Sequence, residues 1–357
     1  SYPAISSILQ LLIDKNKENS KLFLILCGSS LSFMEEQVLG YQSPLYGRRT
    51  SQYKIKPFSF FETCDYYKTF SYEEKALIYG LTSGIPLYLS LFREDKSLKQ
   101  NIIDIFLSSN GYLFEEPTNL IKQECRDPST YNSIIQAIAL GATKLSEISN
   151  QVGIETGLCT TYIKKLISLG IIIKDTPIYK PSKKQTIYLL ADHMFQFWYK
   201  FVLPNISLIN MGMGDRVYKK IEPHFYEFMG YIFEDICKQY LWLLNIHEEL
   251  PLFFLKLGRW WGNDTRIKAE AEIDIVAYND ENQILIGECK WRNEDTDKKV
   301  LDKTIFRSEL FSFLNKYIYL FSKSRFSSYC LEYAKNNPSV HLITFEDIIK
   351  AYELNKS

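Results

Sequence analysis

The chain has 357 residues, 46% hydrophobic and 15% aromatic, which is enough for two or three domains with packed cores. Its 42 basic and 42 acidic residues cancel, so a nucleic-acid partner would have to use a local basic patch. Seven cysteines without a C-x-x-C pair, four histidines and no long apolar run argue against a disulfide framework, a zinc site and a membrane partner, and favour a cytoplasmic protein.

The first 60 residues predict parts of an α/β domain. Residues 4–14 favour a helix, and the apolar run 21–27 favours a strand. A fully apolar strand is typical of a parallel sheet covered on both faces, and polar residues after such a strand, here 28–30, are placed to meet ligands. A short strand at 53–55 and a helix opening at Ser59 follow.

The middle of the chain predicts three helices and a β-hairpin. Residues 131–140 form an apolar helical pattern, Thr143 can cap a second helix, and a third helix covers 156–169. Residues 171–174 and 186–189 are typical of two strands joined by a loop rich in lysine and proline. This order is the layout of a winged helix-turn-helix.

The third helix of this unit is expected to pack Leu158, Ile163, Leu166 and Leu169 inward. Hydroxyl and lysine side chains are expected outward on this helix and along the loop: Thr160, Thr161, Lys164, Lys165, Lys180, Lys183 and Lys184. Such a face suits DNA phosphates, which give affinity but little sequence choice. The alternative is a winged helix used for packing, with solvated lysines.

Near the C-terminus, two β-rich runs, 271–278 and 283–291, flank the polar turn 279–282, which indicates a hairpin. Glu288 and Lys290 lie two residues apart and share a face of their strand, and the hairpin can bring Asp274 beside them. A charged trio on apolar strands costs free energy unless it binds something. Two carboxylates and an ammonium suit Mg²⁺ or Mn²⁺ with a phosphate. Alternatively, Glu and Lys form ordinary cross-strand pairs.

The elements around this hairpin alternate. A helix at 224–244 carries Glu234, and a strand at 253–261 follows it. Beyond Lys290 the sequence predicts a helix, a strand, a helix and a strand, at 297–314, 317–322, 326–336 and 340–345.

Asp274 followed by Glu288-x-Lys290, in this element order, resembles the PD-(D/E)xK nuclease superfamily. The resemblance implies a restriction-endonuclease-like α/β domain with catalytic residues Glu234, Asp274, Glu288 and Lys290. Asp274 and Glu288 would hold the metal, and Lys290 would orient water or stabilise developing charge. A nuclease-like fold that binds nucleic acid without cutting it fits the same residues.

Three features of the front part resemble the archaeal-type ATPase family of the AAA+/STAND group: the apolar run ending in Gly28-Ser29-Ser30, the turn Gly47-Arg48, and Gly84-Ile85-Pro86. In that family a winged helix and a nuclease-like domain often follow the ATPase domain. The resemblance implies a multidomain α/β chain. Residues 1–125 would be the C-terminal part of a P-loop-type ATPase domain with its helical lid, 126–203 the winged helix-turn-helix, and 204–357 the nuclease-like domain.

The chain departs from the family in one respect that decides whether it can hydrolyse ATP. The phosphate-binding motif G-x-x-x-x-G-K-[ST] does not occur in the sequence. No ATP hydrolysis is expected, and ATP would be a cofactor only with the missing N-terminal half. Ser29, Arg48 and Pro86 are then remnants of a nucleotide site, or simply a strand end, a surface arginine and a turn proline. The chain is expected to be a fragment or a truncated relative. Its half sheet would expose an apolar edge to the missing half or to a second copy.

Taken together, the sequence predicts DNA engagement through the winged helix and the nuclease-like domain, with Mg²⁺-dependent phosphodiester cleavage. The alternative is a non-catalytic regulatory or scaffold relative of the ATPases, whose C-terminal domain only binds nucleic acid or protein.

Overall fold

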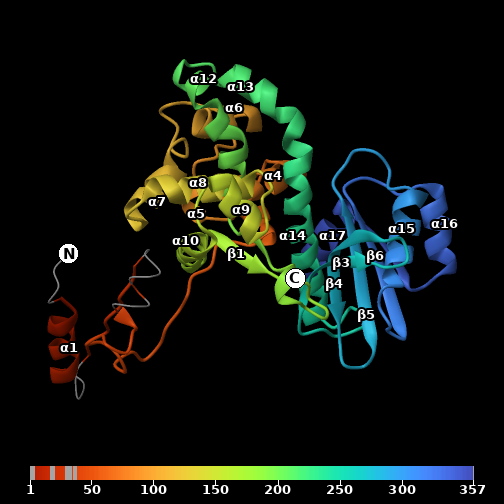
Figure 1. Cartoon of the computed structure of the whole chain (residues 1–357), viewed down its shortest axis with the longest axis horizontal. Helices are drawn as coiled ribbons and strands as arrows, with labels where there is room; N and C mark the ends of the chain where they lie inside the picture. The colour runs from red at the N-terminus through yellow and green to blue at the C-terminus, as the bar shows by residue number, and fades with distance from the viewer. Residues whose placement is uncertain (1–4, 17–20, 29–33, 35–37, 357) are drawn as a thin grey trace.

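The computed structural model describes residues 5–16, 21–28, 34 and 38–356, apart from the side chain of Lys183. It is a mixed α/β structure, as predicted, with a helical N-terminal half and a five-stranded sheet in the C-terminal half (Figure 1).

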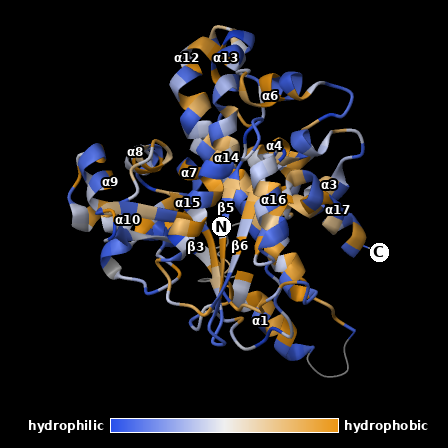
Figure 2. Cartoon of the chain, turned by 90° about the vertical axis from the view of Figure 1, so that its right-hand side faces the viewer, coloured by the Kyte–Doolittle hydropathy of each residue, from blue (hydrophilic) through white to orange (hydrophobic). Residues whose placement is uncertain are grey.

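The predicted strands at 21–27 and 53–55 are wrong. Residues 21–28 have no regular secondary structure, and Phe23 and Ile55 are 84% and 87% exposed. A buried strand needs hydrogen-bonded neighbours, and in the described part of the chain no strand precedes residue 172. Apolar content alone therefore misled the prediction, since it does not show whether a neighbouring strand exists. Helix α1 (Ile5–Lys15) precedes this segment and carries many hydrophobic residues (Figure 2). Ile5, Ile8, Leu11 and Leu12 of this helix are also exposed.

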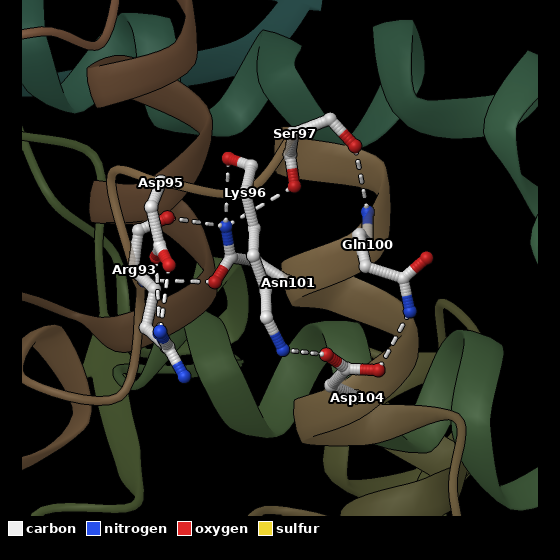
Figure 3. A network of polar contacts seen from close by, with 7 residues as sticks. All are labelled: Arg93, Asp95, Lys96, Ser97, Gln100, Asn101 and Asp104. Carbon is white, nitrogen blue, oxygen red and sulfur yellow. Dashed lines mark hydrogen bonds and ion pairs between the residues drawn. The ribbon is translucent and has the colours of Figure 1, made fainter.

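From Phe60 onward the chain forms short, well-capped helices. The first are α3 (Phe60–Tyr66), α4 (Tyr72–Thr82), α5 (Pro86–Leu89), α6 (Leu98–Phe106) and α7 (Glu116–Glu124). Capping boxes begin α3 and α4, because Ser59 and Ser71 each exchange hydrogen bonds with the glutamate three residues on. Within α6, the buried Asn101 accepts a hydrogen bond from the Arg93 amide and donates one to the Arg93 carbonyl, which fixes the turn before the helix (Figure 3).

The helices and hairpin of the predicted winged helix are all present, within a few residues of their predicted bounds. They are α8 (Pro128–Ala139), α9 (Leu145–Val152), α10 (Thr156–Ser168) and the antiparallel strands β1 (Ile172–Asp175) and β2 (Ile187–Leu190). One inward position is wrong, because Leu158 is 49% exposed and its neighbour Cys159 is buried instead. The helical phase of α10 is thus shifted by one residue at its start.

Helical segments connect this unit to the last domain. They are α11 (His193–Phe197), the π-helical turn η3 (Trp198–Val202), α12 (Ile206–Asn210), α13 (Gly214–Ile221) and the long α14 (Phe225–Ile246). The rings of Phe197 and Phe201 pack against Phe225 and Phe228, so this junction is a continuous aromatic core.

The C-terminal domain is a sheet between two helical layers (Figure 1). In chain order its elements are β3 (Leu257–Asp264), β4 (Ala269–Tyr278), β5 (Gln283–Lys290), α15 (Lys298–Ser308), β6 (Asn315–Ser322), α16 (Ser328–Asn336), β7 (Val340–Thr344) and α17 (Phe345–Asn355). The strand order is β3-β4-β5-β6-β7, antiparallel up to β5 and parallel beyond it. Helices α14 and α17 share one core with the sheet, and α15 and α16 share the other.

Candidate active site

The predicted hairpin is confirmed, and its turn is built by Asn279. The Asn279 side-chain oxygen accepts hydrogen bonds from the Glu281 and Gln283 amides, and Asn282 has a positive φ of 63°. Asparagine suits both positions, because its short amide can mimic a backbone turn, as at Asn279, and because the residue itself tolerates a left-handed backbone, as at Asn282. The turn fixes the register of β4 and β5, which pair from Tyr278↔Ile284 to Ile275↔Gly287.

Asp274 lies at a β-bulge. The register between β3 and β4 shifts between Gly258↔Val276 and Trp260↔Ile273, so Asp274 and Ile275 together oppose the single residue Arg259. A bulge re-aims the side chains around it and is frequent beside active sites. The Asp274 carboxylate turns to β5, where its Oδ2 accepts a 2.8 Å hydrogen bond from the Cys289 amide.

Glu288 is the most enclosed carboxylate of the site, with a side chain only 7% exposed. Burial raises the pKa of Glu288, and the negative charge of Asp274 raises it further. Lys290 opposes this shift from 2.6 Å, and Arg307 of α15 opposes it from 3.6 Å. Asp274 and Glu288 are therefore close enough to repel each other, and two cations hold Glu288 in place.

Lys290 remains an ammonium. Burial lowers its pKa, but the charges of Glu288 and Asp274 outweigh that effect, so the net pKa of Lys290 is raised. Its Nζ also donates to the Cys289 carbonyl at 3.1 Å. A permanent ammonium at this position can stabilise negative charge but does not accept a proton at neutral pH.

Glu234 enters from α14, on the other side of Asp274. Burial raises the pKa of Glu234 to about 7, and Asp274 is the next largest cause. Its counter-ions are Arg259 at 3.6 Å and Lys238 at 4.0 Å. The three carboxylates thus form a row, in which Asp274 is the neighbour that acts on both Glu234 and Glu288.

A pocket of about 360 Å³ opens at the Glu234 end of this row. It is lined by Lys200, Glu227, Gly230, Tyr231, Glu234, Arg259, Glu272 and Asp274. Glutamates and one aspartate outnumber the two cations on its walls, so the pocket favours a cation.

The donor set suits a hard divalent cation, since carboxylate oxygens are the ligands that Mg²⁺ and Mn²⁺ prefer and the repulsion among buried carboxylates is what such an ion relieves. In the described part of the chain, however, no three histidine, cysteine or acidic residues already lie close enough to share one ion. Metal binding would therefore require Glu288 or Glu234 to exchange a cationic partner for the ion.

The structure brings the four predicted catalytic residues into one neighbourhood, but two further residues that the sequence did not assign contact them. Arg259 pairs with Glu234, and Arg307 pairs with Glu288. Arg307 ends the basic helix that follows Glu288-x-Lys290, which is a usable sequence signal. The position of Arg259 depends on the β-bulge, which no pattern in the sequence predicts.

The residues expected to contact DNA are partly engaged elsewhere. The hydroxyls of Thr160 and Thr161 donate to carbonyls one turn back in α10. Lys164 and Lys184 are exposed, and Lys165 is half-buried. The exposed Lys180 has a positive φ of 48°, and the Lys183 side chain lies outside the described part.

The loop between β1 and β2, residues 176–186, is called the wing below, after the predicted winged helix, and it contacts the edge strand β3. The Ile178 amide donates to the Arg259 carbonyl at 2.9 Å, while Gln185 and Trp261 exchange two side-chain hydrogen bonds with each other's carbonyls. The ring of Tyr179 packs on Tyr278, Phe311 and Phe313. The wing therefore covers a strand edge that would otherwise expose backbone groups.

The residues suggested as nucleotide-site remnants are separate from this cluster. Ser29 lies outside the described residues. Arg48 makes two 2.8 Å hydrogen bonds to the Asp14 carboxylate, and Pro86 is the first residue of α5, a position that proline favours. Gly84, in the same motif, has a φ of +71°, and a Cβ there would lie 1.9 Å from the Phe58 carbonyl oxygen. Backbone packing alone accounts for this glycine.

None of the helices in the described residues has both the length and the apolar content needed to cross a membrane.

Fold and site together define a mixed α/β chain whose C-terminal sheet carries a row of carboxylates flanked by cations. A family model described as archaea bacterial proteins of unknown function (DUF234) matches residues 198–301, which include Glu234, Asp274, Glu288 and Lys290. The uncharacterized protein MJECL04 of Methanocaldococcus jannaschii is 36% identical over 324 residues, covering 88% of this chain and 70% of that protein. The chain belongs to the same family as MJECL04.

Two solved structures show weaker similarity. The Walker-type ATPase PABY2304 of Pyrococcus abyssi is 20% identical, with 54% of this chain and 51% of that chain covered and a TM-score of 0.32. Protein VC1899 from Vibrio cholerae is 12% identical, with 73% and 57% covered and a TM-score of 0.28. The chain spans about half the length of the Pyrococcus protein. TM-scores this low carry no argument about fold or activity.

Proposed function

We propose that the C-terminal domain is a nuclease-like unit that binds a divalent cation and cleaves phosphodiester bonds in DNA. The observation that supports this most is the row Glu234, Asp274 and Glu288 beside Lys290, built on α14, β4 and β5. The raised pKa values of Glu234 and Glu288 and the fixed ammonium of Lys290 are costly for stability, and such groups concentrate at functional sites.

Each residue has a role that its environment supports. Asp274 and Glu288, with Glu234 as a third ligand, would hold Mg²⁺ or Mn²⁺, which would supply positive charge at a phosphoryl oxygen. Lys290 keeps its proton and stabilises the negative charge that develops on the phosphate. Burial and the charge of Asp274 raise the pKa of Glu234 to about 7 in the metal-free protein, and a bound cation would offset both effects.

DNA would reach this site along the winged helix. The wing docks directly on β3, so the exposed Lys180 and Lys184 are carried on the loop that covers the edge of the same sheet. Phosphate contacts from these lysines would position a duplex without selecting its sequence.

One observation favours the non-catalytic alternative. Lys290 and Arg307 both engage Glu288, and this arrangement neutralises the carboxylate without any metal. A chain that kept it permanently would bind nucleic acid or protein and act as a regulatory or scaffold relative of the ATPases.

Cleavage of supercoiled and branched DNA by the full chain with Mg²⁺ or Mn²⁺ tests the proposal. We expect wild type to cut, and Asp274→Asn and Lys290→Met to lose at least about 10²-fold in rate, because each removes an electrostatic contribution to the transition state. Asp280→Asn, an exposed change in the hairpin turn six residues from Asp274, is the matched control and should cut as wild type does. Absence of cutting by wild type, with equal DNA binding by all four proteins, would establish the scaffold alternative.

A further inference from the structure

Arg259 occupies an unusual place beside the candidate site. Its guanidinium lies between two carboxylates, with Nε 3.6 Å from Glu234 Oε2 and an Nη group hydrogen-bonded to Glu272. The Arg259 side chain is only 13% exposed and lines the pocket together with Asp274. It therefore supplies positive charge at the end of the carboxylate row where a cation would enter.

The backbone of Arg259 is held in place by its neighbours, but its side chain has a hydrogen-bond donor without an acceptor. The bulge holds Arg259 opposite Asp274 and Ile275, and the wing pins the Arg259 carbonyl through the Ile178 amide. The Nε atom is buried and has no hydrogen-bond partner among the described residues, since 3.6 Å is too long for such a bond. A guanidinium has five donors in a fixed fork, and an optimised permanent ion pair would use this one.

The two partners of Arg259 differ in exposure. The Glu234 side chain is 15% exposed, whereas that of Glu272 is 55% exposed. A rotation of the Arg259 side chain away from Glu234 can keep the contact with Glu272 while moving the guanidinium toward the open pocket. The pocket provides the space for this movement on a backbone that stays in place.

We propose that Arg259 exchanges partners during function. In the metal-free protein it is the counter-ion of Glu234, and when a divalent cation binds the carboxylates it turns outward and holds a phosphate of the DNA backbone. A guanidinium suits the second role because it binds phosphate oxygens in pairs. This inference rests on the proposed cation site and adds a positioning and substrate-binding residue to it.

Manganese binding to the full chain, measured by calorimetry without DNA at fixed pH and ionic strength, tests the first role. Arg259→Gln should bind Mn²⁺ about tenfold more tightly than wild type, because a competing cation beside Glu234 is gone. Arg266→Gln is the matched control, since Arg266 lies just after β3, the strand that carries Arg259, and pairs with Asp264 and Glu309 away from the pocket. Its Mn²⁺ affinity should equal that of wild type.

Binding of a short DNA duplex, with Ca²⁺ replacing Mg²⁺ so that no cutting occurs, tests the second role. Arg259→Gln should bind the duplex more weakly than wild type and Arg266→Gln. Should Arg259→Gln fail to fold, Arg259→Lys is measured in its place. It retains the charge, so its Mn²⁺ affinity should stay near that of wild type while duplex binding weakens.

The outcomes separate this inference from the proposal beneath it. Unchanged Mn²⁺ and duplex affinities in Arg259→Gln, with Mn²⁺ binding lost in Asp274→Asn, would overturn the exchange and leave the cation site standing. Absence of Mn²⁺ binding in both wild type and Arg259→Gln would overturn both.

Discussion

Glu234 makes the stability of this protein depend on pH in a direction opposite to that of most paired carboxylates. Burial and the charge of Asp274 raise its pKa from 4.5 to about 7, so the folded state binds a proton that the unfolded state has already released. Between these two values the folded state holds more protons, and stability falls as pH rises. The contribution is complete below pH 4.5 and is lost by about pH 7.

This linkage predicts that wild type, without divalent cations, loses up to about 3 kcal/mol of unfolding free energy through Glu234 as pH rises from 4.5 to 7. Glu234→Gln should remove that part of the slope, because glutamine does not titrate. Urea unfolding at several pH values in this window measures the pH dependence of stability for wild type and for Glu234→Gln. Parallel stability curves for the two proteins would contradict the pKa assigned to Glu234.

At the scale of secondary-structure elements, the loop between β1 and β2 joins the unit α8–β2 to the five-stranded sheet. Tyr179 packs among Tyr278, Phe311 and Phe313, and its loss would leave a hole in that cluster. The backbone contact of Ile178 with Arg259 depends on this packing, because a single hydrogen bond contributes only about 1 kcal/mol.

We therefore expect Tyr179→Ala to cost about 2 kcal/mol and to release the wing. Limited trypsin digestion should then cut faster after the exposed Lys184. Tyr53→Ala, at a tyrosine that is 84% exposed, is the control and should digest like wild type. Equal digestion of the wing in both variants would show that Tyr179 does not hold it.

The same elements show what sequence patterns can and cannot predict. Helices α8 to α10 and hairpin β4–β5 follow from local signals, such as apolar periodicity and the Asn279 turn. The segment 21–27 has the composition of a buried strand, but burial depends on a partner strand that composition does not specify. The last helix, α17, was not predicted at all, although Thr344 and Asp347 form a capping box at its start.

Within the site, local signals predicted Asp274, Glu288 and Lys290, because strand alternation and hairpin spacing decide which side chains meet. The same signals missed the Arg259–Glu234 pair, which joins β3 to α14 through a one-residue register shift. Such a shift is the outcome of packing across the whole sheet. For that reason the sequence could predict that these acids lie together, while it mostly could not predict the cations that neutralise them.

At the scale of the whole molecule, the helical part and the C-terminal domain share one core. Phe60 of α3 packs against Phe345 of α17, which in turn contacts Trp291 and Phe233. Polar contacts reinforce this junction, since the Phe60 amide donates to Gln239 of α14 at 2.8 Å. Helix α3 is therefore part of the folding unit that contains the carboxylate row.

Truncation of the fully buried Phe60 to alanine should cost about 3–5 kcal/mol and lower the unfolding temperature of the C-terminal domain along with the helical part. Calorimetry measures the unfolding of the whole chain, and the fluorescence of Trp291 reports the unfolding of the C-terminal domain. Phe23→Ala, at an 84% exposed ring, should change stability by less than about 0.5 kcal/mol. Loss of stability in the helical part alone would show that the two parts unfold independently.

The wing also limits how the chain can be divided. A piece beginning at about residue 204 would keep all five strands but lose Ile178 and Gln185, whose groups bond the carbonyls of Arg259 and Trp261. Those carbonyls would then lie bare along a strand edge, where the edge of another molecule can pair with them. The isolated domain would then be expected to self-associate through the edge of β3, which the loop 176–186 covers in the full chain.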